Sequence, residues 1–171
     1  MWLASRLSLM SRSMGSSTST FDISVPSSLR LVESQTFSMP HAGPNPSRQD
    51  APHPHQSVLD PTGQFILVPD LGADLVRVFL VDNKTLRLTA VEPLAAAPGS
   101  GPRHVVFLVS GRTTYMYLIA ELANTITVYH VTYGSSSLGF KEVDVYPTHG
   151  NGQSAPAGAT AAEIVLSVSD A

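Results

Sequence analysis

The 171-residue sequence predicts an all-β chain that forms part of a β-propeller, with about two complete four-stranded blades and pieces of the flanking blades. A pattern of four strands and intervening turns occurs twice, with a period typical of propeller blades. The middle strands of both copies are apolar without alternation, as expected of a blade buried between two neighbours. A sandwich of antiparallel strands is the competing interpretation.

The composition excludes several classes of protein. Hydrophobic residues make up 43% of the chain and charged residues only 13%, which suits strands that are buried on both faces. The formal net charge of −3 leaves no basic face, so we expect no nucleic-acid partner. The absence of cysteine excludes disulfides, Cys-ligated zinc and thiol nucleophiles. No run of 18 apolar residues occurs, and we therefore expect no membrane span.

The first 54 residues predict a leader, a partial blade and a loop. Residues 1–15 carry two arginines and no acidic residue, which weakly resembles a mitochondrial presequence; a disordered leader is the alternative. Residues 16–38 predict a partial blade with two strands, separated by a turn at Pro26. Residues 39–54 contain five prolines and no periodicity, and this predicts an irregular loop.

Residues 55–97 predict the first complete blade. The segment Asp60-Pro61-Thr62-Gly63 has proline and glycine where a turn favours them. Such turns separate the runs that are rich in β-branched and aromatic residues. The expected strands are Ser57–Leu59, Gln64–Val68, Leu75–Val81 and Arg87–Glu92.

Residues 102–147 predict a second complete blade that aligns with the first. Gly63 matches Gly111 at an offset of 48, and Asp74 matches Asn124 at an offset of 50, after a two-residue insertion. The expected strands are Arg103–Leu108, Thr114–Ala120, Thr125–Val131 and Gly139–Val145. Residues 148–161 then predict a loop, and residues 162–171 predict the first strand of a further blade.

Three polar residues are candidates for a catalytic site. The first strand of each blade lines the central channel of a propeller. His55 opens that strand in one blade, and Arg103 holds the matching place in the next, at an offset of 48. Glu121 directly follows an apolar second strand. An imidazole and a carboxylate can perform general acid–base work, and a guanidinium can bind an anion or stabilise an oxyanion.

Purely structural roles remain open for these residues. His55 lies between prolines and loop residues, where a histidine often only caps a turn. Arg103 and Glu121 could form an ordinary salt bridge between blades. His53 and His55 together could suggest a metal site, but no third ligand is in view, and we expect no metal and no cofactor.

Long motifs of this sequence resemble the seven-bladed lactonase family, which includes bacterial-type 6-phosphogluconolactonase and the fungal carboxy-cis,cis-muconate cyclase. The resemblance covers residues from about Ser16 to the end, and SRQDAPHPHQ is closest to the fungal branch. It rests on Ser47–Phe79, on the segments GSGPRHVVF and YLIAELANTITVY, and on Ala155–Ser167. Seven blades of this size need roughly 340 residues, so the resemblance implies a fragment of an expected seven-bladed ring.

The resemblance implies an enzyme that hydrolyses or forms a lactone of a sugar acid or a muconate-type carboxylate, without metal or nucleotide. His55, Arg103 and Glu121 match the proposed catalytic set of the cyclase branch, and we assign Arg103 and His53 to binding a small anionic lactone or carboxylate. The family implies a cytoplasmic location, with the leader leaving mitochondria as an alternative. The alternative function is a truncated, inactive propeller segment that acts as a binding scaffold or arises from an incomplete gene model.

Overall fold

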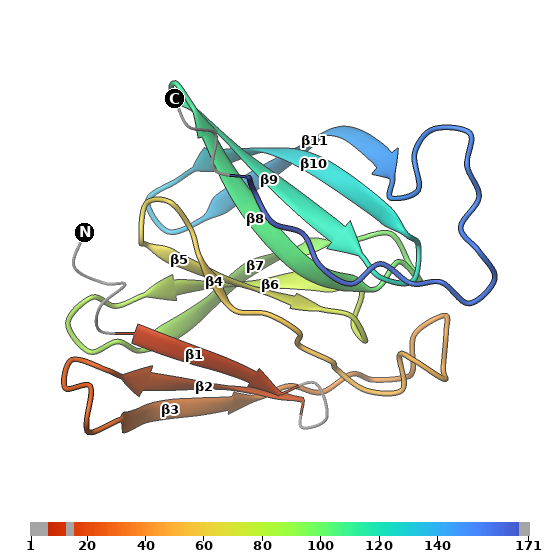
Figure 1. Cartoon of the computed structure of the whole chain (residues 1–171). Coiled ribbons are helices and arrows are strands. Elements are labelled where there is room, and N and C mark those ends of the chain that lie inside the picture. The colour runs from red at the N-terminus through yellow and green to blue at the C-terminus, as the bar shows by residue number, and fades with distance from the viewer. Residues whose placement is uncertain (1–6, 13–15, 168–171) are drawn as a thin grey trace.

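A computed structural model describes residues 7–12 and 16–167, which form eleven strands in three antiparallel sheets lying face to face (Figure 1). Within these residues there is no helix long and apolar enough to cross a membrane. The first sheet has the order β1-β2-β3. Its strands are β1 (Leu7–Arg12), β2 (Ser17–Asp22) and β3 (Arg30–Thr36).

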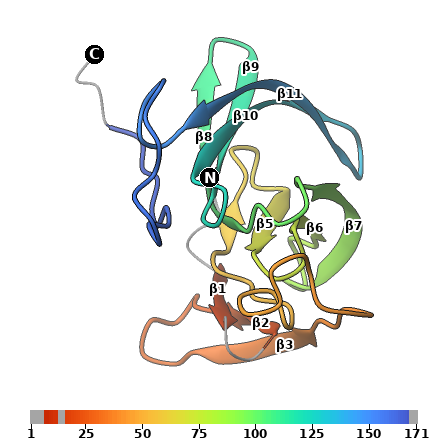
Figure 2. The same cartoon turned by 90° about the vertical axis from the view of Figure 1, so that its right-hand side faces the viewer.

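The other two sheets are four-stranded blades in which each strand pairs with the next along the chain. The second sheet contains β4 (Val58–Leu59), β5 (Phe65–Asp70), β6 (Leu75–Val81) and β7 (Leu88–Ala95). The third contains β8 (Pro102–Ser110), β9 (Thr113–Ala120), β10 (Thr125–Tyr133) and β11 (Leu138–Pro147). Seen from the side, the sheets fan out from one another without closing a ring (Figure 2). The chain is therefore a partial β-propeller with two complete blades, as predicted.

The second sheet is buried on both faces, which explains its continuous apolar runs. All six residues of β5 are buried. Phe65 and Leu67 belong to a core cluster with Met116 and Leu118 of the third sheet. Ile66 belongs to a separate cluster that also includes the half-buried residues Phe37 and Leu59. Since alternate side chains of a strand point to opposite faces, both faces of β5 need apolar residues.

The two blades differ at the turn between their first and second strands. In the second sheet, Asp60 accepts hydrogen bonds from the backbone N–H groups of Thr62, Gln64 and Phe65. The third sheet has no aspartate at this place and uses a shorter hairpin, in which Ser110 pairs directly with Thr113. Sequence divergence at this turn is thus absorbed by a longer pairing of β8 with β9.

The structure differs from the sequence prediction at both ends of the chain. Residues 7–12, which we expected in a leader, form β1 and pair with β2 from Leu7↔Asp22 to Arg12↔Ser17. The spacing of their apolar residues also fits one face of a helix, but the edge of β2 offers them hydrogen-bonding partners. Residues 162–167 form no strand. A strand requires a paired neighbour, and no second strand of a further blade exists among the described residues.

Candidate functional site

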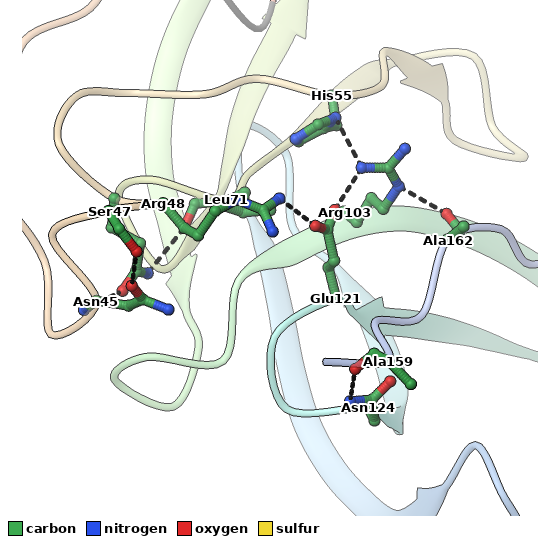
Figure 3. Close-up of polar contacts among 11 residues, drawn as sticks. Asn45, Ser47, Arg48, His55, Leu71, Arg103, Glu121, Asn124, Ala159 and Ala162 are labelled. Atoms are coloured by element: carbon green, nitrogen blue, oxygen red, sulfur yellow. Dashed lines mark hydrogen bonds and ion pairs between the residues drawn. The ribbon is translucent and has the colours of Figure 1, made fainter. Parts of the chain in front are cut away.

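Four polar side chains from separate segments converge beside the first strands of the two complete blades (Figure 3). His55 precedes β4, and Arg103 is the second residue of β8. Glu121 directly follows β9, while Arg48 belongs to the proline-rich loop before the first complete blade. The first three residues were predicted from the sequence, and the structure brings them together. Arg48 was not predicted as a site residue.

Glu121 is the centre of this cluster. Its side chain is only 5% exposed, and its two carboxylate oxygens receive hydrogen bonds from different guanidinium groups. Arg48 donates to Oε1 and Arg103 donates to Oε2. The Glu121 backbone N–H donates to the Gly101 carbonyl at 2.8 Å, which ties the end of β9 to the start of β8. The backbone and both arginines therefore fix the orientation of the carboxylate.

Arg103 links the cluster to the neighbouring blade and to the C-terminal segment. Its Nη1 lies 3.3 Å from Nδ1 of His55, and its Nε donates to the Ala162 carbonyl at 2.8 Å. A guanidinium has no lone pair to accept a hydrogen bond, so Nδ1 of His55 must be the acceptor. The remaining proton of a neutral His55 ring then lies on Nε2.

The charges of the cluster follow from burial and from these contacts. Burial and the positive charge of Arg103 together lower the pKa of His55 to about 4, so the imidazole is neutral at pH 7. Burial alone would raise the pKa of the Glu121 carboxyl, but the hydrogen bonds from Arg48 and Arg103 outweigh it and hold this pKa below its usual range. Two guanidinium charges and one carboxylate therefore leave the cluster with a net positive charge.

The loop that carries Arg48 is held by hydrogen bonds to its own backbone and to the first complete blade. The side chain of Gln49 is fully buried, and its Nε2 donates to the Leu71 carbonyl at 2.9 Å. Its Oε1 accepts from the Asn45 backbone N–H at 3.0 Å. The Arg48 N–H itself donates to the Asn45 carbonyl at 2.9 Å. A loop without periodicity thus places Arg48 over Glu121.

His53, expected to take part in substrate binding, lies on the segment that leads to His55. Its Nε2 is 2.8 Å from Oδ1 of Asp50, and its backbone N–H donates to the buried Asp70 carboxylate at 2.7 Å. In the described part of the chain, no group of three or more histidine, aspartate and glutamate side chains is arranged to hold a metal ion.

Fold and site together define a segment of a β-propeller with an arginine–carboxylate–histidine cluster where two neighbouring blades begin. Comparison with known proteins then places the chain more narrowly. It belongs to the lactonase family of seven-bladed β-propellers, whose family model ("Lactonase, 7-bladed beta-propeller") matches residues 6–171.

Individual relatives agree with this family. The chain is 41% identical over 134 residues to a probable 6-phosphogluconolactonase of Arthroderma benhamiae, covering 78% of this chain and 33% of the relative. The structure of the Pseudomonas aeruginosa periplasmic gluconolactonase matches with a TM-score of 0.70 and 28% identity, over 90% of this chain and 40% of that protein. A putative 6-phosphogluconolactonase of Bacteroides fragilis matches with a TM-score of 0.69 and 26% identity, over 83% of this chain and 40% of that protein.

These relatives are much longer than the chain. The chain spans about a third of the length of the Arthroderma benhamiae protein and about two fifths of the two solved structures. Its sheets accordingly represent a part of the seven-bladed ring that gives the family its name.

Proposed function

We propose that the chain carries the catalytic groups of a lactonase that acts on a small anionic lactone of a sugar acid, of the 6-phosphogluconolactone type. The observation that carries this proposal is the contact of His55, Arg103 and Glu121 in a member of the lactonase family. The names of the relatives support a sugar-acid lactone as substrate. The alternative reaction is the formation of a lactone from a muconate-type carboxylate.

The proposed reaction is attack of water on the lactone carbonyl. Each oxygen of the Glu121 carboxylate can accept a second hydrogen bond, so the carboxylate can orient the water and take its proton. A bond then forms between the water oxygen and the carbonyl carbon. The Nη2 group of Arg103 and the Nε2–H of His55 can donate hydrogen bonds to the oxyanion that develops. The acyl C–O bond of the ring breaks, and the proton held by Glu121 passes to the departing alkoxide.

The lowered pKa of both Glu121 and His55 determines which role each group can take in this reaction. A carboxylate held ionised by two arginines is a weak base, and a neutral His55 whose Nδ1 already accepts a hydrogen bond is better suited to donate than to accept. Glu121 is therefore a weak general base, and most of the rate enhancement must come from stabilisation of the oxyanion by Arg103 and His55. This favours an activated ester such as a lactone over an amide as the substrate.

The test is a hydrolysis assay of the chain with 6-phosphogluconolactone at pH 7. We expect turnover above the spontaneous rate, and we expect Arg103→Ala to lower kcat/KM by about 100-fold, since this guanidinium contacts both other groups. Arg87→Ala is the matched control, because Arg87 is an exposed arginine whose ion pair is with Glu33 and not with a residue of the cluster. Absence of turnover, or equal rates for the two variants, would contradict the proposal.

The alternative function, a segment that acts only as a binding scaffold, makes the opposite prediction. Such a segment would fold and yet show no hydrolysis of 6-phosphogluconolactone above the spontaneous rate. A circular dichroism spectrum recorded on the same preparation separates an inactive folded chain from one that is unfolded.

For the location of the protein, we propose the cytoplasm from the family resemblance, with mitochondria as the alternative.

A further inference from the structure

We propose that Arg48 binds the anionic group of the substrate, whereas Arg103 mainly organises the catalytic groups. This inference rests on the proposed function and assigns a different role to each of the two arginines. The sequence, in contrast, predicted Arg103 and His53 as the binding residues and placed Arg48 in an irregular loop. The ligand chemistry is an oxyanion, a phosphate or a carboxylate, carried by the lactone away from its ring carbonyl.

The hydrogen-bonding capacity of Arg103 is largely used within the protein. A guanidinium has five N–H donors. The Nε–H of Arg103 donates to the Ala162 carbonyl, and Nη1 serves both Glu121 and His55. Among the described residues, only the two N–H groups of Nη2 are left without an acceptor. They face the reacting centre in our mechanism, so Arg103 has no donor left for a second anionic group.

Arg48, by contrast, uses few of its N–H donors within the protein. Its Nη2 donates to Glu121, while its Nε and Nη1 donate to no group in the part of the chain that the structure describes. The side chain is 42% exposed, compared with 26% for Arg103. Figure 3 shows the two guanidinium groups approaching Glu121 from different sides. Arg48 therefore contacts the same carboxylate as Arg103 but keeps its Nε and Nη1 groups available for a ligand.

The position of Arg48 is fixed before any ligand arrives. The Arg48 N–H and the Gln49 N–H both donate to the Asn45 carbonyl, at 2.9 and 2.7 Å, which closes a tight turn. The buried Gln49 side chain anchors this turn to the Leu71 carbonyl. The ion pair with Glu121 then holds the guanidinium itself. A preorganised side chain loses little conformational entropy on binding, which favours affinity.

The charge around Arg48 suits an anion. Glu121 is shared by two guanidinium groups, so one positive charge is left over. The acidic residue nearest to Arg48 in sequence is Asp50, whose carboxylate lies 2.8 Å from Nε2 of His53. A partly exposed guanidinium with free donors in this setting can form two parallel hydrogen bonds to an oxyanion.

The test compares a charged lactone with a neutral one. For 6-phosphogluconolactone we expect Arg48→Gln to raise KM by about 10-fold, the effect of losing a charge-assisted contact, and Arg48→Lys to raise it by about threefold. For glucono-δ-lactone, which carries no charge, we expect both variants to keep KM within about twofold of the parent protein. A carboxylate-bearing muconolactone as a third substrate shows whether a phosphate or a carboxylate is the preferred oxyanion. Arg87→Gln is the matched control, because it removes one exposed positive charge away from the cluster.

A loss of kcat that is equal for the charged and the neutral lactone would overturn the inference, because it would mean that Arg48 acts only by holding Glu121. An unchanged KM for 6-phosphogluconolactone would overturn it as well. Titration of inorganic phosphate by calorimetry at low ionic strength separates this inference from the proposed function. If no lactone is hydrolysed, the proposed function fails; phosphate binding that is weakened in Arg48→Gln and Arg48→Lys but kept in Arg87→Gln still supports an anion site at Arg48. Phosphate binding that is equal or absent in all four proteins overturns it.

Discussion

Asp74 and Asn124 occupy the same position in the two complete blades, and both have a left-handed backbone, with φ of 50° and 55°. The carbonyl of each residue accepts a backbone hydrogen bond at 2.9 Å, from Ala96 and Thr148 respectively. The side chain of each bonds to the segment that leaves the blade. Aspartate and asparagine tolerate positive φ better than other residues with side chains, which explains their place in this turn. The sequence repeat is therefore also a repeat of backbone conformation.

The first prediction concerns the two hydrogen bonds that the Asp74 carboxylate accepts. The backbone N–H groups of Gly99 and Gly101 donate to it at 2.6 and 2.9 Å. Asp74→Ala removes both acceptors and places a residue with no polar side chain at positive φ. We expect a loss of about 2 to 3 kcal/mol in the free energy of unfolding, measured with urea. Asp74→Asn keeps the tolerance for this backbone and one acceptor, and we expect it to lose about 1 kcal/mol. Equal losses for the two variants would contradict this account.

The repeat allowed much of the fold to be predicted from the sequence. The bounds of β6 were predicted as observed, Leu75–Val81, because its apolar run lies between two clear turns. The three site residues were predicted together because equivalent positions in neighbouring blades lie side by side, which the contact between His55 and Arg103 bears out. Repetition carries this information because each copy is packed in the same way.

Features outside the repeat could not be predicted in this way. Arg48 reaches Glu121, which lies 73 residues further along the chain, from a loop whose shape depends on one buried side chain, Gln49. A polar residue in a proline-rich segment gives no sign that it will be buried. The strand β1 was missed because its residues pair with β2, whereas their apolar spacing also fits a helical face.

The second prediction concerns Gly72, which lies in the turn between β5 and β6. A Cβ atom at this position would lie 1.8 Å from the carbonyl oxygen of Ala51 and 3.0 Å from Cδ2 of His53. The chain therefore requires glycine here for a close backbone approach, which ties the loop before His55 to the first complete blade. We expect Gly72→Ala to lower the free energy of unfolding by about 3 kcal/mol.

The control for this substitution is Gly63→Ala. Gly63 has a φ of 73°, but a Cβ atom there would meet no atom of the described residues within 4 Å. We expect a loss of only about 1 kcal/mol, from backbone strain alone. The comparison separates the effect of a clash from that of an unfavourable backbone, and urea unfolding of both variants measures it. A smaller loss for Gly72→Ala than for Gly63→Ala would contradict the close approach.

The third prediction concerns the ion pairs of Glu121. Glu121→Gln leaves Arg48 and Arg103 without their carboxylate, and both guanidinium groups are partly exposed to solvent. Water compensates part of this loss, and we expect about 1 to 2 kcal/mol of destabilisation at pH 7. The pKa of Glu121 is lowered in the folded protein. Its contribution to stability is therefore present above the pKa of the unfolded state and is lost as the pH falls through the folded pKa.

The pH dependence of the free energy of unfolding tests this prediction separately. The difference in unfolding free energy between the parent protein and Glu121→Gln is expected to narrow steadily as the pH falls from 7 toward the acid limit of folding. Glu142→Gln, which removes an exposed carboxylate on β11, serves as the control and is expected to change stability by less than about 0.5 kcal/mol. A difference for Glu121→Gln that stayed constant on acidification would mean that its charge contributes nothing.

The last prediction concerns His55, whose pKa is lowered to about 4 by burial and by the charge of Arg103. The unfolded chain binds a proton at this histidine more readily than the folded one, because the ordinary pKa is 6.5. Stability therefore falls as the pH drops from 6.5 toward 4, and the loss is complete below 4. After allowance for partial exposure, we expect this residue to account for a loss of about 1 to 2 kcal/mol in the free energy of unfolding.

His55→Gln retains an acceptor for Arg103 but cannot titrate, so its stability is expected to decline less over this pH range. His149→Gln, at an exposed histidine, is expected to follow the parent protein, and urea unfolding between pH 7 and pH 4 compares the three. Parallel pH profiles for all three proteins would show that His55 is not held neutral by its surroundings.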